Sequence, residues 1–419
     1  MKTQLSVTAT GRALPAIRPR PLLVLHAIGS ISVARGGPSV ALFDTIAALR
    51  ACGIESEIVT TDDDGAGQRM TAVQTGRPTM YRDVVTHFFP RQTEFYSASL
   101  PMLGWLRRNA SRYDIAHIHA LFNFAPGAAA IAAVAAGVPY VVRPAGVLGT
   151  WGREHRRRWL KQGSLQCIEG PLLRRAAAVQ FTSEAERLEA QGLPLPTRQA
   201  VIPLAVPLAA PGGEGRLDDD GGLGLVGTLQ QVPWLLFLSR LDPKKGVERL
   251  LQAFAFTRRT HPGAQLVIAG SGMPAYEKEL RDHCSQLGLD GCVHWTGFVD
   301  GQRKRWLLSR CTAFVLPSSS ENFGIAAVEA MAAGRPVIVS EGVAVAEIVA
   351  RWNAGTVTGL DPRAIAVALE ATLAEPAAAE LRGQRGREAV ATELSPAAHG
   401  SRLARLYGDI LAERGARPS

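Results

Sequence analysis

The chain of 419 residues lacks several patterns that assign a protein to a class at once. Its five cysteines form no C-x-x-C pair and have no histidine spacing for zinc, which indicates neither a disulfide framework nor a zinc site. No G-x-G-x-x-G follows the first predicted strand, so a nicotinamide cofactor is not expected. The first twenty residues hold no apolar run, so no signal peptide is expected, and unpaired thiols are typical of a reducing compartment.

Long hydrophobic runs are also missing. The longest charge-free stretch, residues 115–142, is rich in alanine and is interrupted by two prolines and two glycines. A membrane span needs about 20 predominantly apolar residues, and prolines inside it would break the helix. We therefore interpret this stretch as a buried helix between two strands.

Acidic residues are scarce in the first half of the chain. Residues 1–203 contain 23 lysines and arginines against 14 acidic residues, which accounts for the whole formal net charge of +9. The densest basic part is residues 150–161, TWGREHRRRWLK, where cations are interleaved with two tryptophans. Such a face can dock on anionic lipid headgroups or hold an anionic acceptor, and a solvated helix face is the plain alternative. No nucleic-acid-binding motif accompanies it, so nucleic acid is not expected as a partner.

Short apolar runs alternate with helical segments along the whole chain. The predicted strands are residues 22–28, 54–60, 114–119, 139–143, 177–181, 200–204, 234–239, 264–270, 293–297, 313–318, 335–340 and 354–357. The predicted helices are residues 38–51, 125–136, 153–175, 183–191, 246–259, 274–287, 301–310, 324–333 and 361–373. Continuous apolar strands joined by helices are typical of parallel sheets covered on both faces. The sequence therefore predicts an α/β protein with two doubly wound, Rossmann-like domains that face a central cleft.

The domain boundaries follow from composition. Residues 205–232 are crowded with glycine, proline and aspartate and show no period, which is typical of a linker or insertion. We expect the following parts: a flexible tail (1–20), a first Rossmann-like domain (21–204), the linker (205–232), a second Rossmann-like domain (233–395) and a C-terminal helix that packs back on the first domain (396–419). Ligands of such sheets bind at the carboxyl ends of the strands, so the substrate is expected between the domains.

Two loops that follow predicted strands are suited to phosphates. Gly36 and Gly37 allow a tight turn before a helix that Pro38 begins, and a helix amino end attracts anions, although a glycine turn without a ligand is equally consistent. Arg240 and Lys245 stand at the two ends of the turn after strand 234–239. A planar guanidinium fork and a mobile ammonium suit a diphosphate leaving group.

A third loop adds carboxylates. Glu321 lies in the loop before a helix that begins near Gly324, and Glu329 lies more than a turn inside that helix, so the two acids do not form one acid/base dyad. We expect Glu321 to face a sugar ring and Glu329 to face ribose hydroxyls, because hydroxyls need carboxylate acceptors. Between them, backbone amides are offered by Asn322, Phe323, Gly324 and Ile325.

Two aspartate triplets, residues 62–64 and 218–220, imitate a D-x-D metal-binding motif. We interpret both as solvated turns. Two cations and two helix amino ends can neutralise a departing diphosphate, so no metal and no cofactor are expected.

Taken together, the motifs resemble a retaining glycosyltransferase of family 4, which has the GT-B fold. The resemblance covers nearly the whole chain and rests on Gly36-Gly37, the HIH strand, Arg240 with Lys245, the AGSG turn at 269–272, and Glu321 to Glu329. It implies that Arg240 and Lys245 contact the diphosphate, that Gly270 and Gly272 belong to the donor site, and that the base lies near Phe298. It also implies that His119 lines the reacting sugar and that Arg143, Gly146 and Trp151 line the acceptor side.

The function expected from this resemblance is sugar transfer from a nucleotide diphosphate sugar to a saccharide or lipid-linked acceptor, with retention of configuration, as in polysaccharide assembly. The location expected is the cytoplasm, with peripheral docking on the inner membrane face through residues 150–161. Two alternatives stay open: a non-hydrolysing sugar-nucleotide epimerase of similar architecture, and a non-enzymatic sugar-binding protein.

Overall fold

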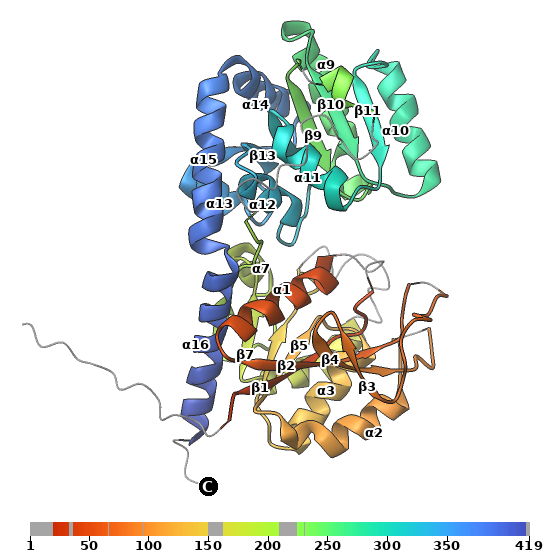
Figure 1. Ribbon diagram of the computed structural model, residues 1–419, viewed down its shortest axis with the longest axis vertical. Helices are drawn as coiled ribbons and strands as arrows, with labels where there is room; N and C mark the ends of the chain where they lie inside the picture. Colours follow the sequence, from red (N-terminus) through yellow and green to blue (C-terminus); the bar gives the residue numbers. More distant parts are fainter. Residues whose placement is uncertain are drawn as a thin grey trace, which may run out of the picture.

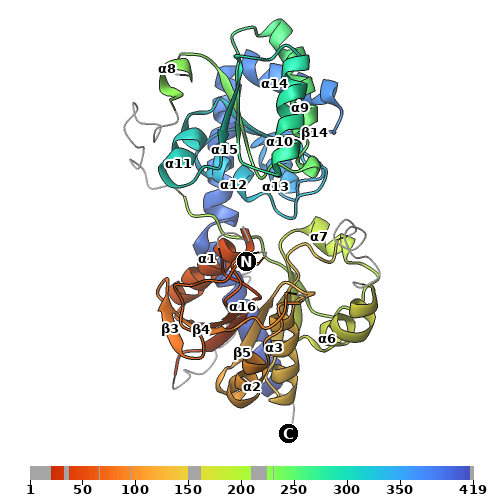
Figure 2. The same cartoon turned by 90° about the vertical axis from the view of Figure 1, so that its right-hand side faces the viewer.

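The computed structural model describes residues 20–32, 37–65, 67–94, 96–149, 162–208, 224–229 and 231–415. Gly36, Trp151 and the whole basic segment 150–161 lie outside these ranges, as does most of the expected linker. The described chain forms two α/β domains, one above the other, with the longest helices along one side (Figure 1). Figure 2 shows the same two domains from the side.

The N-terminal domain is built on an eight-stranded sheet in the order β3-β4-β2-β1-β5-β6-β7-β8. All neighbouring strands are parallel except β3 and β4, which form an antiparallel pair at one edge. The strands are β1 (Leu23–Ala27), β2 (Glu55–Thr61), β3 (Pro78–Tyr81), β4 (Val84–Phe89), β5 (Ile115–His119), β6 (Tyr140–Arg143), β7 (Ala178–Phe181) and β8 (Gln199–Val201). The sequence did not predict β3 and β4.

Helices cover both faces of this sheet. Their bounds are α1 (Gly37–Ala51), α2 (Leu100–Asn109), α3 (Phe124–Ala135), α6 (Gly170–Arg175) and α7 (Glu184–Glu189). Apolar side chains of α2, α3 and α6 pack on one face, and those of α1 pack on the other. Alternate residues of the buried strands therefore point to different helix layers, as the pleat requires.

The C-terminal domain has a six-stranded, fully parallel sheet in the order β11-β10-β9-β12-β13-β14. Its strands are β9 (Trp234–Leu238), β10 (Gln265–Ala269), β11 (Val293–Gly297), β12 (Ala313–Leu316), β13 (Val337–Ser340) and β14 (Gly355–Thr358). Its helices are α8 (Val226–Leu229), α9 (Val247–Thr260), α10 (Pro274–Gln286), α11 (Gly301–Arg310), α12 (Ile325–Ala332), α13 (Ala346–Trp352), α14 (Pro362–Ala374) and α15 (Pro376–Glu393). The predicted strands and most helices of this half match these bounds within one or two residues.

The last helix, α16 (Pro396–Gly415), belongs structurally to the N-terminal domain. It continues below α15 and lies against the N-terminal domain (Figure 1). Leu403, Leu406 and Tyr407 of α16 are buried with Val24, Ile115 and Val141 from three adjacent strands. The far end of the sequence thus covers one face of the first sheet.

The two domains meet at the carboxyl ends of their strands. Ala41 of α1 packs into the core cluster of the C-terminal domain, and Gly37 faces the side chain of Ile325. Thr182 Oγ1 donates a hydrogen bond to the carbonyl oxygen of Asn322 at 3.4 Å. The ends of the strands, where ligands of parallel sheets bind, therefore face each other between the domains.

The described helices include none that combines the length and the apolar composition needed to cross a membrane.

Candidate functional site

The loops after β9 and β12 are tied together by the backbone carbonyl of Lys244. This oxygen accepts hydrogen bonds from the Ser319 backbone N–H at 2.8 Å, the Ser318 hydroxyl at 3.0 Å and the Ser319 hydroxyl at 3.1 Å. Gly246, two residues after Lys244, has a left-handed φ of 72°, and a Cβ there would overlap the carbonyl oxygen of Pro317. Only glycine allows this close approach of the two loops.

The tie places Lys245 against Glu321. Their ammonium and carboxylate form an ion pair, with Lys245 buried and the side chain of Glu321 22% exposed. Burial, together with the charges of Lys244 and Arg240, lowers the pKa of Lys245 to about 7. The adjacent Glu321 carboxylate opposes this effect, because a negative charge in contact favours the charged form of the lysine. The sequence motif at 321 and the one at 245 thus meet in space.

The AGSG turn approaches the same loop from β10. Gly270 has a φ of 141°, and a Cβ there would overlap the carbonyl oxygen of Ser239. The Leu241 backbone N–H donates to the carbonyl oxygen of Ser271 at 2.9 Å, and Gly272 lies beside Leu241. These glycines let the turn pack against the backbone next to exposed Arg240. Their contact with a donor stays a prediction.

Glu329 lies in the second turn of α12, which begins after Gly324. Its Oε1 accepts a hydrogen bond from Lys304 Nζ at 2.6 Å, whereas its Oε2 is buried without a hydrogen-bond partner. Across the domain boundary, burial and the charge of Glu329 raise the pKa of Asp44 on α1. The acid expected at the ribose therefore has one cation in contact and one acid nearby.

The residues between Glu321 and Glu329 take different positions. Phe323 is 2% exposed and packs in the domain core, whereas Asn322 faces Gly146 of the N-terminal domain. Ile325 faces Gly37 at the start of α1. Phe298, at the end of β11, is 65% exposed and is free to contact a planar base. Most of the predicted donor residues that the structure describes thus belong to the C-terminal domain, and Gly37 lies across the boundary on α1.

Three histidines form a buried cluster in the N-terminal domain. His26 of β1 lies beside His117 of β5 in the strand register, and His119 follows on the same face. His26 Nδ1 and His119 Nε2 are 2.9 Å apart, and His117 Nδ1 is 2.6 Å from the hydroxyl oxygen of Tyr407 on α16. His119 is 1% exposed, so its predicted contact with a sugar stays a prediction.

Arg143 lies next to this cluster. It pairs in register with His119, is 2% exposed, and its Nε and Nη1 have no hydrogen-bond partner. Burial lowers the pKa of Arg143 to about 10, against the effect of Glu186 and Tyr407. Its guanidinium is thus charged inside the domain. The acceptor-side role expected for Arg143 and Gly146 stays a prediction, and Trp151 lies outside the described residues.

The histidine cluster has metal-like spacing, because one nitrogen from each of His26, His117 and His119 lies within 4.8 Å of the others. Burial comes first, and the charge of Arg143 second, in lowering the pKa of His26 to about 3. A divalent cation would add positive charge beside the same guanidinium. The arrangement favours neutral imidazoles in a hydrogen-bonded network.

One sequence interpretation is wrong. Asp62 and Asp63 do not lie in a solvated turn, since they are 6% and 3% exposed. Asp63 Oδ1 accepts from Arg91 Nη1 at 2.9 Å, and Asp62 Oδ1 accepts from the Arg91 backbone N–H at 2.7 Å. These acids hold a loop of the N-terminal domain together. The second triplet, residues 218–220, lies outside the described residues.

Several residues of the site were missed by the sequence analysis. They are Lys304, Asp44, His26, Glu186 and Tyr407. Glu186 accepts from the backbone N–H groups of Gly146 at 2.6 Å and Thr182 at 2.7 Å, so it orders the loop after β6. The T-S-E-A-E segment carries a capping-box spacing, Ser183 to Glu186, that could have indicated this ordering role. Lys304 had no comparable signal.

Two regions of the chain match models of known protein families. Residues 36–205 match the model described as "Glycosyl transferase 4-like domain". Residues 228–389 match the model described as "Glycosyl transferases group 1". The first match covers the N-terminal sheet from α1 onward, and the second runs from α8 into α15.

Individual relatives agree with these matches. The glycogen synthase of Mycobacterium tuberculosis is 33% identical over 184 residues, which is 44% of each chain. The D-inositol 3-phosphate glycosyltransferase of Acidothermus cellulolyticus is 32% identical over 229 residues, which is 52% of this chain and 50% of the relative. The chain therefore spans about half the length of the curated relatives it matches.

A solved structure extends the likeness to almost the whole fold. Anabaena HepE in complex with UDP and glucose superposes with a TM-score of 0.71 over 93% of this chain and 100% of that chain, at 20% identity. At this identity the likeness shows the fold alone. The fold class expected from the sequence is confirmed: the chain has the GT-B fold, and each of its two domains matches a glycosyltransferase family.

Proposed function

We propose that the protein is a retaining glycosyltransferase of family 4 that transfers a sugar from a nucleotide diphosphate sugar to a saccharide or lipid-linked acceptor. The proposal needs no metal ion and no cofactor. In this proposal the C-terminal domain binds the donor, and the N-terminal domain binds the acceptor. Polysaccharide or glycolipid assembly in the cytoplasm is the setting that we propose for this reaction.

The observation that carries the proposal is the convergence of Arg240, Lys245 and Glu321 at one edge of the C-terminal sheet. The Lys245–Glu321 ion pair joins two loops that are 76 residues apart in the sequence. Cations suit phosphates, and carboxylates suit sugar hydroxyls. A nucleotide diphosphate sugar carries both phosphates and hydroxyls, so its binding site needs both cations and carboxylates.

The proposed chemistry depends on the leaving group. As the bond from the sugar carbon to the diphosphate oxygen breaks, negative charge accumulates on the diphosphate, and Arg240 and Lys245 stabilise it. The acceptor hydroxyl attacks from the same face, and its proton passes to the departing phosphate oxygen. Two cations in place before the reaction reduce the need for a divalent ion.

The acceptor assignment is supported by charge and position. The excess positive charge of the chain lies in its first 203 residues, which favours an anionic or lipid-linked acceptor on that side. His119, Arg143 and Gly146 lie at the carboxyl ends of β5 and β6 or just beyond them. This is the edge that faces the C-terminal domain.

Donor binding is the first test. The purified protein is screened by thermal shift with UDP-, GDP-, ADP- and dTDP-linked sugars, because a ligand that binds only the folded state raises the melting temperature. A rise with one donor class is expected. The absence of any rise at millimolar donor would contradict the proposal.

Product analysis then separates the rival activities. With the selected donor and a panel of saccharide and lipid-linked acceptors, NMR of the first product should show the anomeric configuration of the donor. Activity should survive treatment with EDTA. An inverted linkage contradicts retention, loss of activity in EDTA contradicts metal independence, and an epimerised donor formed without acceptor supports an epimerase instead.

A further inference from the structure

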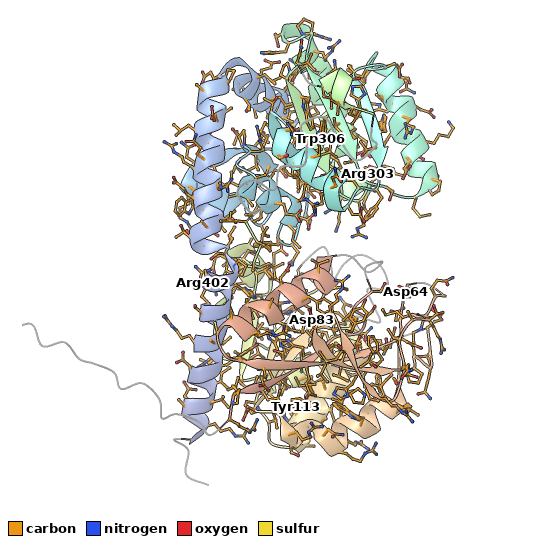
Figure 3. All side chains as sticks on the ribbon, in the orientation of Figure 1. Asp64, Asp83, Tyr113, Arg303, Trp306 and Arg402 are labelled. Atoms are coloured by element: carbon orange, nitrogen blue, oxygen red, sulfur yellow. The ribbon has the colours of Figure 1, made fainter. Side chains whose placement is uncertain are left out.

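Lys304 is the cation in contact with Glu329. It lies near the start of α11, and its Nζ is 2.6 Å from Glu329 Oε1. Arg303 and Trp306, labelled in Figure 3, mark the helix that carries it. The sequence does not distinguish Lys304 from its neighbours, because it belongs to the basic run Gln302-Arg303-Lys304-Arg305.

This contact differs from an ordinary surface ion pair. The side chains of Lys304 and Glu329 are 32% and 24% exposed, whereas those of the helical pair Lys278–Asp282 are 76% and 54% exposed. Exposed pairs contribute little because water competes for both partners. A partly buried, charge-assisted hydrogen bond holds the carboxylate in one orientation more firmly.

The orientation leaves one acceptor vacant. Glu329 Oε1 is occupied by Lys304, and Oε2 is buried without a hydrogen-bond partner. A buried acceptor without a donor is unfavourable, and a hydroxyl that reaches it restores the missing hydrogen bond. The carboxylate is thus prepared for a further donor on one defined oxygen.

A second charge makes the lysine necessary. Burial, and after it the charge of Glu329, raises the pKa of Asp44 on α1 of the N-terminal domain, so the two carboxyl groups lie close enough to interact. Two carboxylates that face each other across the domain boundary repel. Lys304 places a positive charge in contact with Glu329 on the C-terminal side of this boundary.

We propose that Lys304 is a positioning residue for nucleoside recognition: it fixes Glu329 through Oε1, so that Oε2 accepts a hydrogen bond from a ribose hydroxyl. The proposal rests on the proposed function, since it requires a nucleotide donor. It adds a residue from α11 to a site otherwise formed by the loops after β9 and β12. It also predicts that the lysine contributes to the choice of ribose over deoxyribose.

The test compares ribonucleotides with 2′-deoxyribonucleotides by isothermal titration calorimetry. UDP, GDP and ADP are titrated into the wild-type protein, and the tightest binder is compared with its 2′-deoxy form. A charge-assisted hydrogen bond makes the ribonucleotide bind about tenfold tighter or more. In Lys304→Met and Lys304→Gln, this ratio should fall below about threefold, because Glu329 is no longer held.

Two controls separate positioning from charge and from folding. Lys304→Arg keeps a donor at the same place and should retain most of the ratio. Arg305→Met removes a neighbouring exposed cation of α11 and should leave the ratio unchanged. Melting temperatures of all variants check that they are folded.

The outcomes distinguish the two proposals. A wild-type protein that binds nucleotide with ribose preference, and Lys304 variants that keep the full preference, would overturn the role of Lys304 alone. A wild-type protein that binds nucleotide without ribose preference would overturn it as well. Failure of the wild type to bind any of the three ribonucleotides overturns the inference, whereas the proposed function is contradicted only if the thermal-shift screen, which also includes dTDP-linked sugars, finds no donor.

Discussion

The two domains place their charged groups differently at the facing edges of their sheets. In the C-terminal domain, Glu321, Glu329 and Lys304 have side chains that are 22% to 32% exposed, and each acid has a lysine partner. In the N-terminal domain, His119 and Arg143 are 1% and 2% exposed. One edge keeps its charges within reach of a ligand, and the other has enclosed its polar groups.

The difference indicates that one edge is suited to ligand binding and the other to stability. At the C-terminal edge Arg240 is exposed and both acids are partly exposed, although Lys245 is buried, so a phosphate or a hydroxyl can replace water there. The enclosed imidazoles hold the last helix in place: His117 of β5 contacts Tyr407 of α16, and His399 of α16 contacts Thr45 of α1. Variants of the first group should therefore change activity, and variants of the second should change stability.

The largest expected effect is a loss of stability in acid. Burial lowers the pKa of His26 to about 3 and of His399 to about 4, and lowers the pKa of His117 and His119 well below 6.5. The unfolded chain then binds more protons below pH 6.5, so stability is lost as the pH falls. Unfolding in urea should show a free energy lower by roughly 5 kcal/mol at pH 5.5 than at pH 7.5.

A variant tests the origin of this loss. His399→Gln removes one of the four groups, so the fall in the free energy of unfolding from pH 7.5 to pH 5.5 should shrink by about 1 kcal/mol. The raised pKa values of Asp44 and Glu186 act in the opposite direction, so a net fall points to the histidines. A free energy of unfolding that is equal at both pH values would show that the imidazoles are not held neutral.

The next effect concerns the donor edge. Arg240→Ala and Lys245→Ala should each lower kcat/KM by several tens-fold or more, on the order of one lost charged contact to the transition state. The melting temperature should change little, because the side chain of Glu321 reaches solvent when its partner is removed. Steady-state kinetics and thermal melts on the same samples measure both quantities.

Lys278→Ala is the matched control. This lysine lies in the same domain, and its side chain is 76% exposed, so kcat/KM should stay within about twofold of the wild type. Near-normal turnover in both Arg240→Ala and Lys245→Ala would refute their role at the diphosphate.

The smallest effect isolates the link between the sheet and α16. Tyr407→Phe removes the hydroxyl that lies 2.6 Å from His117 Nδ1, and should lower the free energy of unfolding by about 1 to 2 kcal/mol. Donor affinity, measured by calorimetry, should not change. Tyr276→Phe, which removes a hydroxyl bonded to Glu248 at a partly exposed site, is the control and should have a smaller effect. Reduced donor affinity in Tyr407→Phe would contradict the expectation that the enclosed polar groups of the N-terminal domain affect stability alone.

The fold was predictable wherever strands are buried on both faces. β9 and β12 read as continuous apolar runs because every residue in them is buried. β3 alternates between exposed and half-buried residues over only four positions, so it has no comparable signal. α15 was missed because its interior contains Gly383 and Gly386, which weaken a helical pattern. Gly383 is needed there, since a Cβ would overlap the carbonyl oxygen of Gly334.

The site was predictable where function resides in motifs next to strand ends. Arg240, Lys245 and Glu321 could be assigned because each follows an apolar run. His26 could not, because its position beside His117 is a property of the parallel register between β1 and β5. Lys304 could not either, since its partner Glu329 is 25 residues away on another helix. Contacts between elements are decided by packing, which local patterns do not contain.

The position of α16 has a consequence for synthesis on the ribosome. The last strand of the first sheet ends at Val201, and the helix that covers that sheet begins at Pro396. At roughly 5 to 20 residues per second, translation of the intervening chain takes about 10 to 40 seconds. During that interval Val24, Ile115 and Val141 lack their apolar cover. The first domain is therefore the last to be completed. Chaperones that recognise exposed apolar strands can bind it during that interval.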